Sequence, residues 1–358
     1  MPTQYVPPEA DYWLPVPPPG ETWHTHTIHT HYFGWSIPSE KLGCFIYVRA
    51  QPHFKLCLAG VSIFRGMNNL RPLDCEHSNI VNTLPWPTVT PSGEGGSMKL
   101  ETENGLSIEF LEPGHKMRIV YKSKDGATHF DVTQTGLCPA LPRGHVMAGE
   151  DRDRREGQKP GGLEQLMHCV GDVTLNGKEY KIDCSASRDR SWGQVRTEDE
   201  VTFPPIGWSP MAFGKELSFN QVGIEDYQKS TPDWEGVFKY DKSKPSHHFS
   251  WLVKDGTEVR NVIKVHRRVL EFHPQLHSAI KQEIEFEDDK GEKYFIKGEA
   301  IAVAQLPSWP NNVFVDSVYR WEDDKGRVTH CAYQEAWYAR YQQFVKGLLD
   351  IKPKQAIP

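Results

Sequence analysis

Two arginines, a carboxylate and an indole occur within five consecutive positions of this chain, Arg188 to Trp192. At their centre, Asp189 could act as a general acid or base if it is held out of water. A buried guanidinium without a partner is costly, so Arg188 and Arg190 need carboxylate or carbonyl partners. The group is therefore interpreted either as a structural ion-pair network or as the polar centre of a ligand site.

The register of the preceding strand decides which way these side chains point. Residues 179–186 alternate between apolar and polar side chains, as in a strand with one buried face. If the alternation continues, Arg188, Arg190 and Trp192 point inward and Asp189 points outward. A β-bulge, which is common beside active sites, would reverse this assignment, and the sequence leaves both registers open.

Four histidines cluster near the start of the chain: His24, His26, His29 and His31. Imidazoles bind transition metals, but on a strand the first two face one side and the last two face the other. No neighbouring carboxylate completes a ligand set. A histidine-rich strand is the favoured interpretation, without a metal or another cofactor, and His29 or His31 is a candidate hydrogen-bonding contact for a ligand.

Glu164 and His168 would share one strand face with Leu166 and Val170. Both titratable groups are then expected to enter an apolar interior, where pKa values shift and active sites are frequent. His168 is a reserve acid-base candidate and Glu164 a candidate substrate contact. A core histidine with ordinary hydrogen bonds is the plainer interpretation of His168.

Glu335 stands between Tyr333 and Trp337 on one face of an expected strand. The carboxylate could pair with Arg188 or Arg190, which is the favoured interpretation. It could also serve as an acid, and Glu335 is therefore the second reserve catalytic candidate.

Composition argues against several classes of function. The 358-residue chain has a net charge of −6 and no basic block, which disfavours nucleic-acid binding. Seven scattered cysteines without a C-x-x-C pair, and no signal-like N-terminus, favour reduced thiols in the cytoplasm. No run approaches the roughly 20 apolar residues of a membrane span. Nucleotide-binding glycine motifs and the G-x-S-x-G elbow of serine hydrolases are also absent.

The spacing of turn residues along the chain is typical of an all-β protein. Residues 1–22 form a Pro-rich arm that is expected to lie extended on the surface. Tight-turn pairs such as Asn176-Gly177 separate short strand-like segments, as in β-hairpins.

The chain is expected to divide near residue 160. The charged and glycine-rich stretch 144–162 predicts a linker. It separates two β-domains, residues 23–160 and residues 161–358, each a barrel or sandwich. Helical spacing of apolar residues predicts one short C-terminal helix, with Trp337, Tyr341, Phe344 and Leu348 on its buried face.

Residues 163–195 carry a resemblance to a known family. The hairpin Glu164 to Asp183, with Gly171-Asp-Val-Thr-Leu-Asn-Gly at its centre, and the following Arg188-Asp-Arg-Ser-Trp-Gly193 resemble the start of the second half of AttH-like proteins. This family of tandem lipocalin-like (calycin) proteins includes carotenoid hydratases, or hydroxyneurosporene synthases, and fungal Diels–Alderases of decalin biosynthesis. The opening segments Tyr32-Phe-Gly-Trp35 and Tyr47-Val48 are similar to the family more weakly.

The resemblance implies two lipocalin-like domains with a hydrophobic cavity at their interface for an isoprenoid-, steroid- or polyketide-like molecule. In the hydratases a carboxylic acid protonates an alkene, which makes Asp189 the expected proton donor here. Arg188 and Arg190 would then orient polar groups, although they would lower the pKa of Asp189 unless they point away from it. The expected aromatic walls are Trp192, Trp208 and Trp337.

We therefore expect a cofactor-independent lyase or isomerase, most concretely a hydratase or dehydratase. Two alternatives stay open. One is a non-catalytic carrier of a hydrophobic ligand, and the other is a pericyclase or cyclase that holds its substrate in a reactive conformation. The expected partner is a hydrophobic small molecule, and a homodimer is left open.

Overall fold

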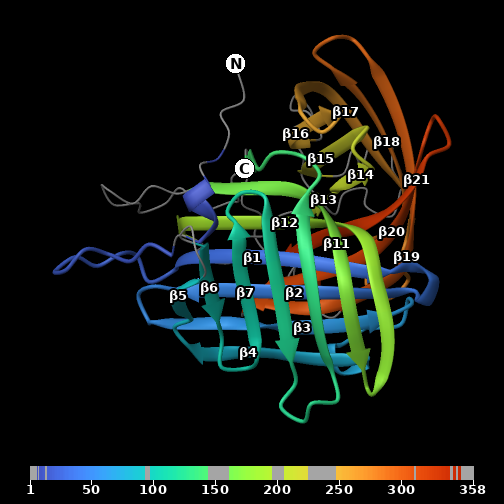
Figure 1. Ribbon diagram of the computed structural model, residues 1–358. Coiled ribbons are helices and arrows are strands. Elements are labelled where there is room, and N and C mark those ends of the chain that lie inside the picture. Colours follow the sequence, from blue (N-terminus) through green and yellow to red (C-terminus); the bar gives the residue numbers. More distant parts are fainter. Residues whose placement is uncertain are drawn as a thin grey trace. The chain divides into compact units, whose positions relative to one another are not determined.

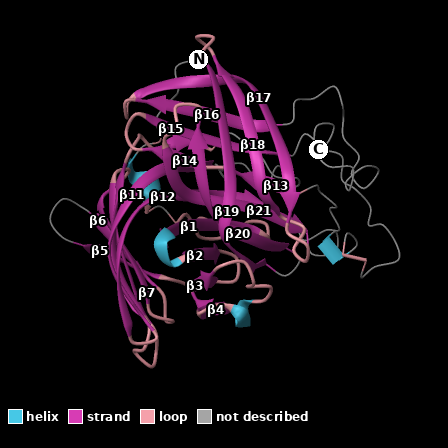
Figure 2. Ribbon diagram, turned by 90° about the vertical axis from the view of Figure 1, so that its right-hand side faces the viewer, coloured by secondary structure: helices cyan, strands magenta, loops and turns pink. Residues whose placement is uncertain are grey.

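The computed structural model describes residues 6, 8–12, 14–92, 97–143, 161–195, 205–224, 247–309, 312–338, 342–343 and 346–347. Strands dominate these residues, which confirms the all-β prediction (Figures 1 and 2). Contacts divide the chain into unit 1, residues 1–64 and 75–197, and unit 2, residues 65–74 and 198–358. No helix among the described residues is long and apolar enough to cross a membrane.

Unit 1 is built on one large sheet. Its strand order is β4-β3-β2-β1-β12-β11-β9-β8-β7-β6-β5, and the short β10 pairs with β11. The elements are η1 (Pro8–Asp11), β1 (Thr27–Ile37), η2 (Pro38–Glu40), β2 (Leu42–Gln51), β3 (Leu56–Arg65), β4 (His77–Pro85), β5 (Thr88–Ser92), β6 (Ser97–Glu101), β7 (Leu106–Glu112), β8 (Lys116–Lys122), β9 (His129–Gly136), β10 (Leu141–Pro142), β11 (Gly161–Leu175) and β12 (Lys178–Val195).

Unit 2 is a closed barrel. Its order is β13-β21-β20-β19-β18-β17-β16-β15-β14, and an additional pairing of β13 with β15 closes the sheet. The elements are η3 (Pro72–Asp74), β13 (Ile206–Trp208), β14 (Met211–Phe213), β15 (Leu217–Ile224), β16 (His247–Lys254), β17 (Glu258–Phe272), β18 (Ala279–Asp288), β19 (Lys293–Trp309), β20 (Asn312–Asp323) and β21 (Val328–Tyr338).

The hairpin that carries Asp189 forms as its sequence predicts. β11 and β12 pair along their whole common length without a register shift, and a two-residue turn joins them. The turn residues Asn176 and Gly177 have φ values of 50° and 82°. Positive φ at both positions is the geometry of a type I′ turn, which matches the twist of the flanking strands.

The central strands of unit 1 are buried on both faces. The apolar core of the unit lies on one face, where Phe33 and Trp35 of β1 pack with Ile46 and Val48 of β2. We call this the core face. Every residue of β1 is buried, including those that alternate onto the opposite side, which we call the second face. Antiparallel sheets usually leave one face to solvent, so a buried second face is unusual.

Two boundaries differ from those that the sequence predicts. Residues 161–195 pair with β9 and β1 and therefore lie in unit 1, although the sequence predicts that a second domain begins near residue 161. Of the linker predicted over 144–162, residues 144–160 lie outside the described residues, and Gly161 and Gly162 belong to β11. Trp337 belongs to β21, which pairs with β20 to its end, and not to a helix. The other residues on the face of that helix, Tyr341, Phe344 and Leu348, lie outside the described residues.

Candidate functional site

Asp189 and its neighbouring arginines point to opposite faces of the unit 1 sheet. The β11–β12 ladder has no bulge at these positions. Arg188 and Arg190 lie on the core face, whereas Asp189 lies beside Tyr32 of β1 on the second face. The register without a bulge is therefore the one found, and both guanidiniums point away from the Asp189 carboxylate.

On the core face, the arginines hold the Pro-rich arm. Arg188 donates to Asp11 Oδ1 at 2.5 Å and, through Nε, to Gln165 Oε1 at 2.7 Å. Arg190 donates through Nε to the Ala10 carbonyl at 2.5 Å. Ala10 and Asp11 are buried, so this part of the arm enters unit 1 and does not lie on its surface as expected. For these arginines, the ion-pair network is the interpretation that the geometry favours.

His29 and His31 are buried in the same network. His29 Nε2 lies 2.7 Å from the Pro15 carbonyl, and His29 Nδ1 accepts from the Gly193 N–H at 2.9 Å. Arg190 donates to His31 Nε2 at 2.8 Å. Burial lowers the pKa of His29 to about 3 and holds the pKa of His31 well below its usual range. Both rings are neutral, and no three His, Cys, Asp or Glu side chains of the described chain are grouped to hold a metal ion.

The buried imidazoles predict a fold that is sensitive to acid. The unfolded chain takes up a proton at His29 near the ordinary pKa of about 6.5, whereas the folded protein does not until about pH 3. Acidification therefore favours the unfolded state. Below pH 6.5 we expect the free energy of unfolding to fall by about 1.4 kcal/mol per pH unit for each such histidine.

Urea unfolding at a series of pH values between about 7 and 5 measures this slope, in a range where carboxylates contribute little. His29→Gln should reduce the slope by the contribution of one proton, about 1.4 kcal/mol per pH unit. His53 is exposed, and His53→Gln should leave the slope unchanged. Equal slopes in the wild type and the His29 variant would count against a neutral, buried His29.

Asp189 belongs to a row of polar side chains on the second face. Cross-strand pairing places Glu164 of β11, Asp189 of β12, Tyr32 of β1 and Tyr47 of β2 side by side, and we call these residues the polar row. Paired side chains share a face, with Cβ atoms about 5 Å apart. Asp189 is partly exposed, and the other three are buried. The row therefore holds two neighbouring carboxylates, one of which a ligand could reach.

Small and aromatic residues surround the polar row. Ser187 and Ser191 flank Asp189 on its own strand and are buried. The ring of Phe45 lies 5.5 Å from each tyrosine ring of the row, measured between centroids. A carboxyl group in such surroundings can protonate an alkene, and aromatic ring faces can stabilise the cation that results.

His168 does not join this site. It lies where the second face is open to solvent, and its Nε2 contacts Asp183 Oδ1 at 2.7 Å in an exposed pair. Val170 is likewise exposed, whereas Glu164 and Leu166 are buried. The expected burial is therefore found for Glu164, although in a polar row, and not for His168, because the burial of this face ends between them.

Glu335 lies in unit 2, inside the barrel. One carboxylate oxygen accepts from the Tyr333 hydroxyl at 2.7 Å and from the Ala279 N–H at 3.0 Å, and the other accepts from Trp337 Nε1 at 3.0 Å. Arg267 donates to the same Tyr333 hydroxyl at 2.8 Å. This buried network, and not the predicted pairing with Arg188 or Arg190, satisfies the carboxylate.

Trp192 and Trp208 have structural neighbours of their own. The Arg190 guanidinium lies 5.4 Å from the centre of the Trp192 ring in unit 1. Trp208 lies in unit 2 and donates to Asn220 Oδ1 at 2.7 Å. Of the predicted site residues, the structure thus brings Asp189 and Glu164 together on the second face. Arg188, Arg190, Trp192, His29 and His31 are together on the core face.

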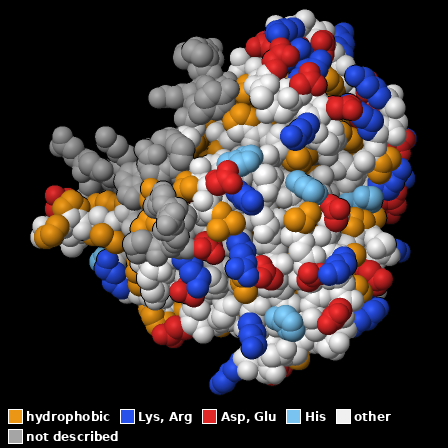
Figure 3. All heavy atoms as spheres, viewed as in Figure 1, with side chains coloured by type: hydrophobic (Ala, Val, Ile, Leu, Met, Phe, Trp, Pro, Cys, Tyr) orange, Lys and Arg blue, Asp and Glu red, His pale blue; other side chains and the backbone are white. Residues whose placement is uncertain are grey.

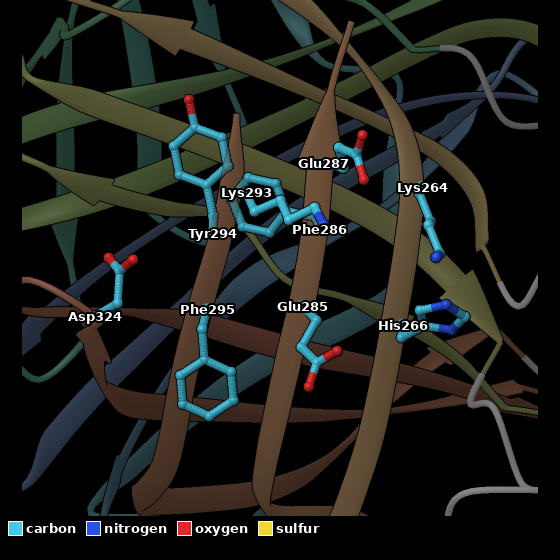
Figure 4. Close-up of a pocket in the computed structure, with 9 residues that line it drawn as sticks. All are labelled: Lys264, His266, Glu285, Phe286, Glu287, Lys293, Tyr294, Phe295 and Asp324. Atoms are coloured by element: carbon cyan, nitrogen blue, oxygen red, sulfur yellow. The ribbon is translucent and has the colours of Figure 1, made fainter. Parts of the chain in front are cut away.

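A hollow of about 320 Å³ lies on unit 2, over β17, β18 and β19 (Figure 4). Lys264 of β17 pairs with Glu287 of β18, and Glu287 pairs with Lys293 of β19. Positive and negative side chains thus alternate across these three strands. Figure 3 shows Lys and Arg intermixed with Asp and Glu on the visible face. Pairs of opposite charge on neighbouring strands are common on the solvent-exposed face of a sheet. We therefore do not take this hollow as the candidate site.

Two arginines that the sequence does not predict as site residues lie in the cross-strand row next to the polar row. Arg49 of β2 pairs with Thr30, Thr30 pairs with Ser191, and Ser191 pairs with Gly162 of β11. Arg143 follows β10, donates its N–H to the Gly162 carbonyl at 2.9 Å, and lays its side chain against Gly162. These five residues form a second row, the arginine row. Its one signal in the sequence is Arg49, a lone charge within the apolar run 44–50.

Comparisons with known proteins support the fold. The family model described as a domain of unknown function (DUF7064) matches residues 18–338. No curated protein sequence matches the chain significantly. The structure of CghA is similar with a TM-score of 0.55 and 11% identity, over 92% of this chain and 96% of CghA.

Two further solved structures have the same architecture. A Nitrosomonas europaea protein provisionally named AttH has a TM-score of 0.52 and 13% identity, over 90% of this chain and 99% of that one. Kievitone hydratase from Nectria haematococca has a TM-score of 0.51 and 12% identity, over 95% of each chain. At these identities the likeness establishes the fold alone, and it confirms the AttH-like architecture that the sequence predicts.

Proposed function

Because this chain belongs to the DUF7064 family, whose description assigns no activity, we propose a function from the site itself: a cofactor-independent lyase or isomerase of a hydrophobic small molecule. The most concrete reaction is the addition of water to an alkene, or its removal. The kievitone hydratase with a similar fold makes this reaction class a reasonable first choice.

The observation that carries the proposal is the position of Asp189. Its carboxyl group is partly exposed, in a largely buried row with a second carboxylate and two tyrosines. The two arginines next to it in sequence occupy the core face with their own partners. The hydrogen bonds of these two guanidiniums are thus made on the core face, although the charge of Arg190 still acts on Asp189.

In the proposed hydration, the protonated Asp189 carboxyl gives its proton to one alkene carbon. The π electrons form the new C–H bond and leave a cation on the adjacent carbon, near the rings of Tyr32 and Tyr47. The oxygen of a water molecule bonds to that carbon. The resulting oxonium returns a proton to the Asp189 carboxylate, so that the acid is regenerated. Dehydration follows the same steps in reverse.

Native mass spectrometry of the purified protein, followed by denaturation, tests for a co-purifying apolar compound. That compound, or a panel of alkene-bearing isoprenoids, steroids and polyketides, is then incubated with the protein. Product heavier or lighter by one water supports a hydratase or dehydratase, and product of unchanged mass supports an isomerase or cyclase. Binding without any turnover across the panel would replace the proposal by a carrier function.

A further inference from the structure

Two buried cysteines face each other across the β11–β12 hairpin. Cys169 of β11 pairs directly with Cys184 of β12, and both belong to the apolar core of unit 1 as free thiols. Directly opposite residues of an antiparallel pair have Cα atoms about 4.5 or 5.5 Å apart, depending on their position in the ladder. Disulfides span Cα separations of about 4.4 to 6.8 Å. The two sulfurs can therefore bond to each other without a rearrangement of the hairpin.

The hydrogen bonds around Cys184 favour its thiolate form. The Cys169 thiol donates to the Cys184 sulfur, which also accepts from the Ser36 N–H at 3.3 Å. These contacts hold the pKa of Cys184 below its usual value although the side chain is buried, whereas burial raises the pKa of Cys169. Because the thiolate is the nucleophilic form of cysteine, Cys184 is suited to attack an oxidant and Cys169 to react second.

Cys184 lies where β1 separates from β12. The ladder between these two strands ends at the pair Phe33–Arg188, so the Ser36 N–H is available to the Cys184 sulfur. Cys184 keeps an exposure of 7%, whereas Cys169 has 0%. A small oxidant therefore meets Cys184 before it meets Cys169.

We propose that Cys169 and Cys184 form a redox modification site, which a hydroperoxide converts reversibly to a disulfide. The Cys184 thiolate attacks the terminal peroxide oxygen and becomes a sulfenic acid. The O–O bond breaks, and the other oxygen leaves with a proton as water or an alcohol. This inference does not depend on the proposed lyase or isomerase activity.

The second step closes the disulfide. The Cys169 sulfur loses its proton and attacks the sulfenic sulfur of Cys184, and the S–O bond breaks to release water. Together the two sulfurs lose two electrons, which the peroxide gains. A thiol reductant reverses the reaction by thiol–disulfide exchange.

Limited oxidation of the native protein with hydrogen peroxide tests this proposal. The remaining thiols are blocked with N-ethylmaleimide, and the denatured protein is digested with trypsin. Cleavage after Lys178 and Lys181 separates the two cysteines, so linked peptides that dithiothreitol releases identify the bond by mass spectrometry. We expect this pair to be oxidised at least about tenfold faster than Cys57, because burial raises the pKa of Cys57 to about 12.

Two serine variants separate the roles of the cysteines. Cys169→Ser should leave Cys184 as a sulfenic acid that dimedone labels, and Cys184→Ser should leave Cys169 unoxidised. Cys57→Ser, at another buried cysteine of unit 1, is the matched control and should leave the disulfide unchanged.

The wild-type protein alone can overturn the proposal, even if a variant fails to fold. A disulfide from either cysteine to Cys44 in its place, or oxidation of Cys57 at the same rate, would do so. Protein in which Cys169 and Cys184 stay reduced would show that both are only small apolar residues of the core. Absence of dimedone label on Cys184 in Cys169→Ser would equally count against the mechanism.

Discussion

Asp189→Asn is expected to reduce turnover by about 10²- to 10⁴-fold, the usual contribution of a positioned general acid. Asparagine has nearly the same shape but cannot supply the proton. Asp189 is partly exposed and has its neighbouring arginines on the other face, so we expect little change in stability. The measurements are initial rates with a substrate found as described above, and thermal unfolding of the same preparations.

Asp183→Asn is the matched control for this prediction. Asp183 lies on the same strand and the same face, six positions before Asp189, but it is exposed and paired with His168. Its substitution should leave turnover unchanged. Similar rates for wild type and Asp189→Asn would remove Asp189 as the acid, and a comparable loss in both variants would point to a general effect of charge.

Asp11→Leu is expected to destabilise the folded protein by about 3–5 kcal/mol. Its carboxylate pairs with Arg188, and both side chains are almost fully buried, with exposures of 0% and 1%. Removing one partner leaves the guanidinium desolvated, which costs more than the pair itself contributes. Urea unfolding measures the change.

The double variant Asp11→Leu/Arg188→Met distinguishes a buried charge from lost packing. Replacing both ions by apolar side chains should recover most of the lost stability. The exposed pair Arg71–Asp74 is a matched control, and breaking it should cost at most about 1 kcal/mol. A double variant as unstable as the single one would mean that the shape of this contact matters more than its charge.

The path of the hairpin could be predicted from sequence because its determinants are local. Alternation over residues 179–186 and the Asn176-Gly177 turn fix which face each residue occupies. The faces of Arg188 and Asp189 follow once no bulge intervenes, and the absence of a bulge becomes visible only in the ladder with β11. The alternation of apolar and polar residues thus predicts the face of each side chain, but it does not show whether a β-bulge interrupts the strand.

The partners of these residues could not be predicted, because they come from distant parts of the chain. Asp11 lies 177 positions before Arg188 and sits in a segment whose prolines suggest only an extended arm. Arg49 lies near the polar row because it belongs to β2, which β1 separates from β12 in the sheet. The predicted burial of His168 is wrong for a related reason. Alternation shows which face of the strand a residue occupies, but not how far along the strand that face stays buried.

The two-residue turn between β11 and β12 has a consequence for the order of folding. Glu164 and Asp189 lie on the two arms of this one hairpin, so their alignment requires only a local chain closure. Contacts between neighbouring segments form early, whereas contacts that close long loops form late. In refolding, the two acids should therefore come into register before residue 11 docks onto Arg188, and arm docking should be among the last steps to complete.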